Sequence, residues 1–306
     1  MSETTSKAMR HAILGAGGVG GLIGACLARS RDSVTLVVRP ESVKQYPKQL
    51  RLESAFANFT VEVAVAAEVP AVDVLWITVK ATQLEAALGA IKNPDDVRAI
   101  VPLLNGIDHI ELLRARCGKE RVIPATIAVE TERVSAGHIV HRSPFARLQV
   151  SSVGKAALFG TLDQLQRLGF DCGFGDNEAT LMWGKLVFLA PFALATTAAD
   201  KTVGEILSDP YWRSLGEACV REACAVGIAE GASVDADKVL SAVSKMPGNM
   251  RSSMMKDVAA RKTPELDAIA GPLLRGAARH GLDVPATKTL VAAVEKRAGF
   301  VDSRLA

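Results

Sequence analysis

Short hydrophobic runs alternate with helical patterns through the first half of the chain. Five runs rich in aliphatic and β-branched residues predict strands, at His11–Leu14, Ser33–Val38, Val72–Thr78, Ala99–Leu104 and Val122–Val129. Helical spacing between them predicts helices at Gly18–Arg29, near Thr82–Ile91 and near Ile107–Arg116. Continuous apolar strands separated by helices are typical of a parallel sheet covered on both faces. Short alternating stretches within residues 137–160 are expected to add antiparallel strands to that sheet.

The pattern changes after about residue 176, where strand signals end and long stretches rich in alanine and leucine begin. Helices are predicted at Glu178–Ala199, Pro210–Glu230, Asp235–Lys245, Ser252–Ala260, Thr263–His280 and Pro285–Ala298. A chain of 306 residues is long enough for two domains. We therefore expect an α/β Rossmann-type N-terminal domain over residues 1–176 and an all-helical domain over residues 177–306.

Composition bears on which partners the protein binds and on the cell compartment in which it works. The net charge is +3, from 36 basic and 33 acidic residues, which is too balanced to favour nucleic acid or a membrane surface. The N-terminus is polar, so we expect no signal peptide, and the early apolar run over residues 12–27 is too rich in glycine for a spanning helix. The five cysteines form no CxxC pair, which favours free thiols in the cytoplasm, and no metal-ligand spacing occurs.

A glycine-rich motif follows the first predicted strand. Its residues are Gly15, Ala16, Gly17, Gly18, Val19 and Gly20, in the pattern GxGxxG. The first glycine permits a tight turn, the second lets a pyrophosphate approach the backbone, and the third lets helix and strand pack closely. The helix N-terminus then offers amide groups to the phosphates. A purely structural glycine turn is the alternative, but the order of strand, motif and helix favours dinucleotide binding.

The end of the second strand bears on the choice of dinucleotide. A protein that binds NAD places Asp or Glu there to bond the ribose 2′-hydroxyl, whereas this chain has Arg39, followed by Pro40. A guanidinium suits a 2′-phosphate, and Lys44 is a second cation nearby. The alternative is that Arg39 is a solvated loop residue. We favour NADPH as the cofactor.

Several further segments carry a family resemblance. They are ITVKATQ, with Lys80; LLNGID, with Asn105; MWGKLVFLAPFALATTA, with Lys185; and the C-terminal block from NMRSSMMKD through TPELD to HGLDVP. Together with the glycine motif they span nearly the whole chain, which resembles the ketopantoate reductase family. The resemblance implies NADPH-dependent reduction of 2-dehydropantoate (ketopantoate) to pantoate in pantothenate biosynthesis, by a Rossmann domain and a helical domain. It also suggests a homodimer.

The resemblance also implies roles for individual residues. Lys185 matches the general acid of the family, and Asn105 matches the asparagine that touches both nicotinamide and substrate. Lys80 and Glu265 match residues that contact the cofactor. Ser253 matches the serine that binds the substrate carboxylate, although a helix-capping role explains a serine there equally well.

The chemistry of ketone reduction calls for the same residue types. Hydride attack builds negative charge on the carbonyl oxygen, so a group must donate a proton there. A lysine can do this if burial lowers its pKa, and Lys185 lies in an apolar stretch. Taken alone, Lys185 would be interpreted as a surface lysine on an amphipathic helix. Glu265 is a candidate to balance its charge, whereas no partner spacing makes His138, His141 or His280 catalytic.

The match fails at two positions on the helix of Lys185. Members of the family typically carry asparagines four and eight residues after the lysine, and this chain has Leu189 and Ala193 there. Those positions share a helix face with Lys185, so the face has become apolar, although Thr196 and Thr197 follow. Three hypotheses stay open: ketopantoate reduction, NADPH-dependent reduction of a more apolar 2-oxo acid or ketone, and a non-catalytic NADPH sensor.

Overall fold

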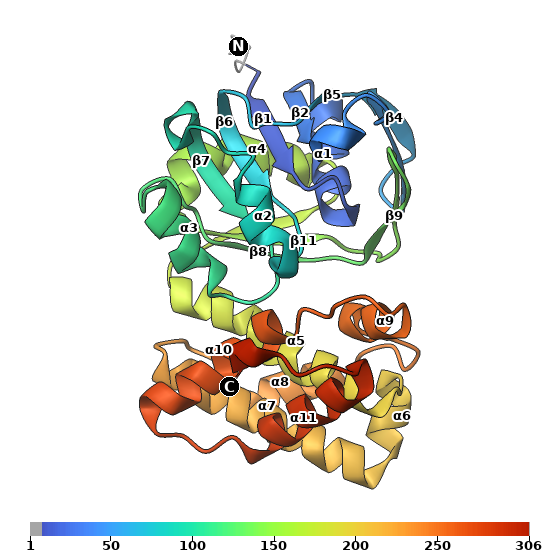
Figure 1. Ribbon diagram of the computed structural model, residues 1–306, viewed down its shortest axis with the longest axis vertical. Coiled ribbons are helices and arrows are strands. Elements are labelled where there is room, and N and C mark those ends of the chain that lie inside the picture. The colour runs from blue at the N-terminus through green and yellow to red at the C-terminus, as the bar shows by residue number, and fades with distance from the viewer. Residues whose placement is uncertain (1–7, 306) are drawn as a thin grey trace. The chain divides into compact units, whose positions relative to one another are not determined.

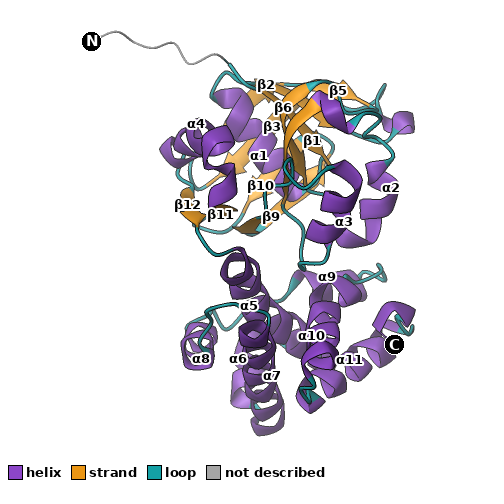
Figure 2. Cartoon of the chain, turned by 90° about the vertical axis from the view of Figure 1, so that its left-hand side faces the viewer, coloured by secondary structure: helices purple, strands orange, loops and turns teal. Residues whose placement is uncertain are grey.

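The computed structural model describes residues 8–305, and its contacts divide the chain into two units. The N-terminal unit comprises residues up to 104 and residues 109–176, and the helical unit comprises residues 105–108 and those from 177 onward. Figure 2 shows the strands gathered in the first unit and only helices and loops in the second. The loop 105–108 belongs to the helical unit although both of its flanks lie in the other, which the sequence did not indicate.

The centre of the N-terminal unit is a parallel sheet, as predicted, and one of its five strands, β5, was not predicted (Figure 1). Its strands, in the order β5-β2-β1-β6-β7, are β5 (Ala64–Ala66), β2 (Ser33–Val37), β1 (Arg10–Leu14), β6 (Val72–Ile77) and β7 (Val97–Pro102). Successive residues of β1 face two different hydrophobic cores, one on each side of the sheet. Ile13 packs into the core beside helix α1 (Gly18–Arg29), while Ala12 and Leu14 pack into the core beside α2 (Leu84–Leu88) and α3 (His109–Cys117). Burial on both faces explains the continuous apolar strands.

Two predictions about the remaining strands were wrong in large part. Of the segment Val122–Val129, only Val122 meets the parallel sheet, through an isolated parallel bridge with Ile100 of β7. The rest forms β8 (Ala125–Ala128), which pairs antiparallel with β11 (Arg147–Ser151) in a separate sheet that also contains β12 (Asp171–Gly175). The alternating stretches of residues 137–160 do not extend the parallel sheet either. They supply β10 (His138–His141) and β11 to other sheets, and their last part forms helix α4 (Lys155–Arg167).

The third sheet was not predicted from the sequence. It has the order β4-β3-β10-β9 and is built from β4 (Phe59–Glu62), β3 (Gln49–Ser54), β10 and β9 (Thr131–Ser135). Helix α1 contacts all four of these strands as well as β1 and β2, so it is covered by sheets on both sides. Gly21 permits this close packing, because a Cβ there would lie 2.3 Å from the side chain of Ile139.

The helical unit has seven α-helices within the described residues. They are α5 (Glu178–Ala199), α6 (Val203–Ser208), α7 (Pro210–Ala229), α8 (Ala236–Ser244), α9 (Ser253–Ala259), α10 (Leu266–His280) and α11 (Pro285–Ala298). Short 3-10 turns in the chain are η1 (Pro40–Ser42), η2 (Ala81–Gln83), η3 (Pro94–Asp96), η4 (Ser152–Gly154) and η5 (Ser303–Leu305). Helix α10 begins later than predicted, because Glu265 occupies its N-cap position and Thr263 lies outside the helix.

Helix α5 is the core helix of this unit. It packs against α7, α9, α10 and α11, and its buried residues include Trp183, Leu186 and Leu194. By length and composition alone α5 could cross a membrane, but 56% of its most apolar stretch is buried inside the protein. Helix α5 is hydrophobic on nearly every side because other helices surround it.

Candidate active site

The glycine-rich loop links β1 to α1 with the close contacts that its sequence predicts. Gly15 has φ +107°, in a region that favours glycine, and the Thr78 hydroxyl donates a 2.7 Å hydrogen bond to its carbonyl oxygen. A Cβ on Gly20 would lie 2.2 Å from the same carbonyl oxygen. A Cβ on Gly18 would lie 2.7 Å from the carbonyl oxygen of Thr131. Three of the glycines are thus required by the protein's own packing.

Gly17 differs, because a Cβ there would meet nothing within 4 Å. It occupies the N-cap position of α1 and forms no side-chain cap, so no side chain of the N-cap residue occupies the first amide groups of this helix. A helix N-terminus with such amides suits an anion. Val19 packs against the core and Ala16 is buried, so neither side chain fills the space in front of Gly17. This loop fits a dinucleotide pyrophosphate.

Two cations nominated from the sequence follow the two strands that flank β1 in the parallel sheet. Arg39 comes after β2, at the start of η1, and is exposed; within residues 8–305 it forms no ion pair. Lys80 comes after β6, in the N-cap position of η2, and is half-buried. The strand order reverses its direction at β1, and ligands of open α/β sheets bind at the carboxyl ends of strands on either side of such a point.

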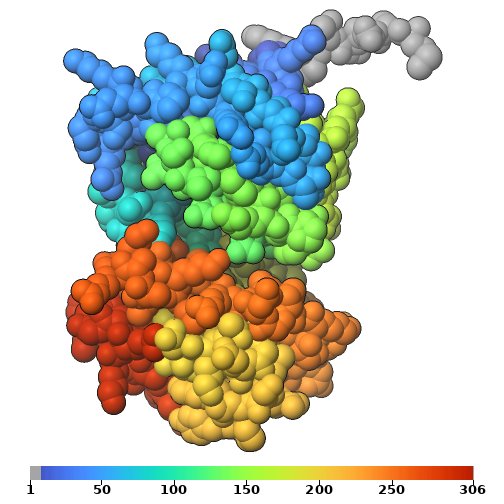
Figure 3. Space-filling view, turned by 90° about the vertical axis from the view of Figure 1, so that its right-hand side faces the viewer, coloured from blue at the N-terminus to red at the C-terminus, as the bar shows by residue number. Residues whose placement is uncertain are grey.

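A third cation, Arg133 on β9, was missed from the sequence. Its guanidinium donates a 3.3 Å hydrogen bond to the carbonyl oxygen of Ala16, and the hydroxyl of Tyr46 donates another of 3.3 Å to the same atom. Arg133 lines a pocket of about 370 Å³ together with Ser42, Gln45, Tyr46, Val134, Ser135 and Ala136. Figure 3 shows the segment around residue 135, in green, seated among blue segments from the first part of the chain. No local motif could reveal this contact, because it joins residues 117 apart in sequence.

Lys185, Asn105 and Glu265 form one hydrogen-bonded chain inside the helical unit. The ammonium group of Lys185, on α5, donates to the Oδ1 atom of Asn105 at 3.1 Å. The Nδ2 atom of Asn105 donates to the Oε2 atom of Glu265 at 3.1 Å. This order fixes the orientation of the Asn105 amide, because its oxygen must face the ammonium donor and its nitrogen the carboxylate. The structure therefore brings together three residues that the sequence nominated from distant segments.

The surroundings of Lys185 change its acidity. Its side chain is only partly accessible, and burial lowers the pKa of its ammonium group to about 8, although the carboxylate of Glu265 raises that pKa. Glu265 itself is 7% exposed. An ammonium group with a pKa near 8 is protonated at neutral pH and gives up its proton far more readily than an ordinary lysine.

The same face of α5 continues with Leu189 and Ala193. Leu189 is half-buried and packs against the core of the helical unit, and Ala193 is buried within that core. Ser252 is buried and accepts hydrogen bonds from the Thr196 hydroxyl at 2.9 Å and, as cap of α9, from a backbone amide. Ser253 is the first residue of α9 and is exposed, so its neighbour carries the capping role.

The cysteines and two of the candidate histidines are accounted for by burial or by local hydrogen bonds, apart from the hydrogen-bonded chain of Lys185, Asn105 and Glu265. All five cysteines are free, and burial raises the pKa of the Cys26, Cys172 and Cys219 thiols to about 12, which leaves little reactive thiolate at neutral pH. His138 bonds Glu53 and His280 bonds Glu230, each within its own unit.

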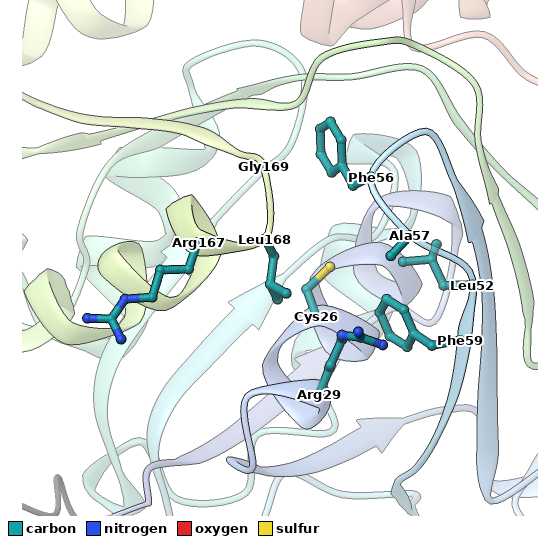
Figure 4. A pocket seen from close by; sticks show the side chains of 9 residues that line it. All are labelled: Cys26, Arg29, Leu52, Phe56, Ala57, Phe59, Arg167, Leu168 and Gly169. Carbon is teal, nitrogen blue, oxygen red and sulfur yellow. The ribbon is translucent and has the colours of Figure 1, made fainter.

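A second pocket of about 370 Å³ lies elsewhere in the N-terminal unit (Figure 4). It is lined by Cys26, Arg29, Leu52, Phe56, Ala57, Phe59, Arg167, Leu168 and Gly169. Arg29 lies over the ring of Phe59, and Arg167 pairs with Asp163, so both cations already have partners. None of the residues nominated from the sequence lines this pocket.

A dinucleotide-binding loop and a lysine able to protonate an oxygen define the class: this is an oxidoreductase that acts on a CH–OH group with a nicotinamide cofactor. Comparison with known proteins narrows it further. The family "Ketopantoate reductase PanE/ApbA" matches residues 11–154, and "Ketopantoate reductase PanE/ApbA C terminal" matches residues 178–298. The chain belongs to the ketopantoate reductase family, which confirms the resemblance seen in its sequence.

Individual relatives cover most of the chain. The "Uncharacterized oxidoreductase YkpB" of Bacillus subtilis is 28% identical over 305 residues, covering 93% of this chain and 97% of that protein. A 2-dehydropantoate 2-reductase of Mycobacterium tuberculosis is 31% identical over 224 residues, covering 72% of this chain and 74% of its own length. The crystal structure of a PanE/ApbA family ketopantoate reductase from Ralstonia eutropha superimposes with a TM-score of 0.83 at 26% identity, covering 95% of this chain and 99% of that one.

Proposed function

We propose that this protein reduces a 2-oxo acid with NADPH, and that ketopantoate, reduced to pantoate for pantothenate biosynthesis, is its first candidate substrate. The observation that carries the proposal is the hydrogen-bonded chain from Lys185 through Asn105 to Glu265. Relatives described as 2-dehydropantoate 2-reductases support ketopantoate in particular.

In the proposed reaction the protein supplies the proton that the carbonyl oxygen of the substrate takes up. When bound, NADPH supplies a hydride to the carbonyl carbon of the substrate. Lys185 donates its proton to the oxygen that becomes negative, and with a pKa of about 8 it holds that proton at neutral pH. Asn105 accepts a hydrogen bond from the Lys185 ammonium group and so fixes the orientation of that group. The carboxylate of Glu265 favours the protonated form of Lys185. We assign Ser253 to the substrate carboxylate on the family resemblance alone.

NADPH rather than NADH is proposed because of the cations around the glycine-rich loop. Arg39 stands where an NAD-binding protein places a carboxylate, and Arg133 adds a second guanidinium beside Ala16. Neither arginine has an acidic partner within residues 8–305, so both are available to a phosphate. We assign Lys80, which follows β6 on the other side of β1, to the cofactor as well.

A more apolar 2-oxo acid or ketone is the second candidate substrate. Leu189 follows Lys185 by one helical turn on α5 and is only half-buried, so an apolar surface replaces a polar one there. A site that lacks hydrogen-bonding partners for a hydroxyl group discriminates poorly in its favour. Steady-state rates with ketopantoate and with bulkier apolar 2-oxo acids decide between the two, because a clear preference for ketopantoate removes the second candidate.

The experiment that tests the proposal is Lys185→Ala. Loss of the proton donor is expected to lower kcat for 2-oxo acid reduction by roughly 100-fold or more, followed as NADPH oxidation at 340 nm. NADPH affinity, measured by fluorescence titration, should change little. Lys201→Ala, just beyond the end of α5 and paired with Asp209, is the matched control and should keep normal turnover. Normal turnover in Lys185→Ala would refute the mechanism.

A non-catalytic NADPH sensor is the alternative from another class. Tight NADPH binding by the wild-type protein, with no oxidation by any 2-oxo acid, would favour that alternative. We further propose a cytoplasmic location and a homodimer. Sedimentation of the purified protein checks the oligomeric state.

A further inference from the structure

The loop 105–108 is attached to helix α10 along its whole length. Asn105 bonds Glu265, the N-cap residue of that helix. Gly106 has φ +80°, and a Cβ there would lie 2.2 Å from the carbonyl oxygen of Ala268, so the loop backbone lies directly on the first turn. Ile107 packs against the core of the helical unit. The loop is therefore held in place by α10 and the core behind it.

The last residue of the loop is held by an arginine network. Arg275, on α10, donates to the Asp108 carboxylate at 2.5 Å and to the Asp267 carboxylate at 2.8 Å. The nitrogen that bonds Asp267 also donates to the carbonyl oxygen of Arg304, in the turn η5, at 3.1 Å. Asp267 is 19% exposed, Arg275 is 38% exposed and Asp108 is 53% exposed, so the guanidinium links a largely buried carboxylate to an exposed one.

Gly271 makes room for this network. It lies inside α10, where glycine is less favourable than most residues, and it is buried. A Cβ at this position would lie 2.1 Å from a terminal nitrogen of Arg275 and 2.5 Å from a carboxylate oxygen of Asp267. The guanidinium therefore lies back along the helix over the glycine, in a place that a larger residue would occupy.

We infer that Arg275 is a positioning residue for catalysis: through Asp108 it holds the loop 105–108 so that Asn105 stays within hydrogen-bonding distance of Lys185. This inference rests on the proposed function, in which Asn105 orients the proton donor. Arg275 acts only through the loop, because it bonds neither Asn105 nor Lys185. A displacement of a catalytic group by about 1 Å can lower a rate by up to about 100-fold.

The test compares four variants of the full chain. Arg275→Ala removes the guanidinium, and Gly271→Ala displaces it while improving the helix propensity of α10. Both are expected to lower kcat by roughly 10-fold, with NADPH affinity within about 2-fold of wild type. Arg279→Ala is the matched control, since Arg279 lies four residues later on the same helix and pairs with Glu230 instead. The control should keep the wild-type kcat, and Arg275→Lys should recover part of it.

Two readouts separate positioning from a general loss of structure. Amide hydrogen exchange in residues 106–108 is expected to be roughly 10-fold faster in Arg275→Ala than in Arg279→Ala. In an Asn105→Ala background, Arg275→Ala should change kcat by less than about 2-fold, because the group that it positions is already absent. An equal loss of kcat in both backgrounds, or unchanged exchange in the loop, overturns the inference. If the wild type reduces no 2-oxo acid, the proposed function fails, and hydrogen exchange alone decides whether Arg275 holds the loop.

Discussion

Replacing Glu265 with glutamine tests how the hydrogen-bonded chain controls the proton donor. Glutamine has nearly the same size and keeps an oxygen that can accept the bond from Asn105, but it removes the negative charge. The carboxylate of Glu265 raises the pKa of Lys185 against the effect of burial. Without it, burial alone acts, so Glu265→Gln should lower the pKa of Lys185 below its value of about 8.

The size of the change follows from the separation of the two charges. Two hydrogen bonds of 3.1 Å joined through one amide group place the ammonium and the carboxylate roughly 7 Å apart. At an effective dielectric constant of about 20, two unit charges at that distance interact by about 2 kcal/mol. One pH unit corresponds to about 1.4 kcal/mol, and solvent near the half-accessible lysine reduces the effect, so we expect the pKa of Lys185 to fall by about 1.

The assay is the pH dependence of kcat/KM for 2-oxo acid reduction. Lys185 must be protonated to donate, so the rate is constant below its pKa and falls as pH rises through it. In the wild type this fall should be centred near pH 8, and in Glu265→Gln about one pH unit lower. Amine-labelling rates of Lys185 against pH give the same pKa without turnover. Glu230→Gln, at the C-cap of α7, is the control. A profile of Glu265→Gln that coincides with wild type, or moves to higher pH, would refute the reasoning.

Three further predictions address the cofactor, the fold of the helical unit and the substrate. Arg39→Ala should raise the KM for NADPH by roughly 10-fold with little change for NADH, because it removes a charge-assisted contact to the 2′-phosphate, and equal effects on the two cofactors would contradict the NADPH assignment. Arg133→Ala should raise the KM for both cofactors, because Arg133 bonds Ala16 in the loop that fits the pyrophosphate common to them. Ser252→Ala should lower the free energy of unfolding in urea by about 1–2 kcal/mol, because it removes the cap of α9 and a bond to α5. Ser253→Ala should lower the free energy of unfolding by less than about 0.5 kcal/mol and should instead raise the KM for the 2-oxo acid. A larger loss of stability in Ser253→Ala than in Ser252→Ala would contradict the assignment of the cap to Ser252 and of substrate binding to Ser253. Leu189→Asn should raise kcat/KM for ketopantoate over apolar 2-oxo acids by roughly 10-fold, and an unchanged ratio would show that this position does not select the substrate.

Local patterns predicted the elements well where packing follows from nearby residues. Helices α1 and α5 begin and end as predicted, because each is continuous in sequence and its periodicity reports burial directly. The predictions were wrong where strand pairing is long-range. Ala125–Ala128 has the composition of a parallel strand, yet it pairs with Arg147–Ser151 in another sheet. Composition records that a strand is buried but not which neighbour it bonds.

The sequence by itself indicated the glycine-rich loop and the family, and it nominated Lys185, Asn105 and Glu265, because each lies in a recognisable local motif. Only the tertiary structure decided that these three form one hydrogen-bonded chain, since they come from segments up to 160 residues apart. It also decided that Arg133 reaches the glycine-rich loop and that the loop of Asn105 belongs to the helical unit. The physical reason is that a motif fixes backbone geometry over a few residues, whereas the distance between two side chains depends on the packing of everything between them.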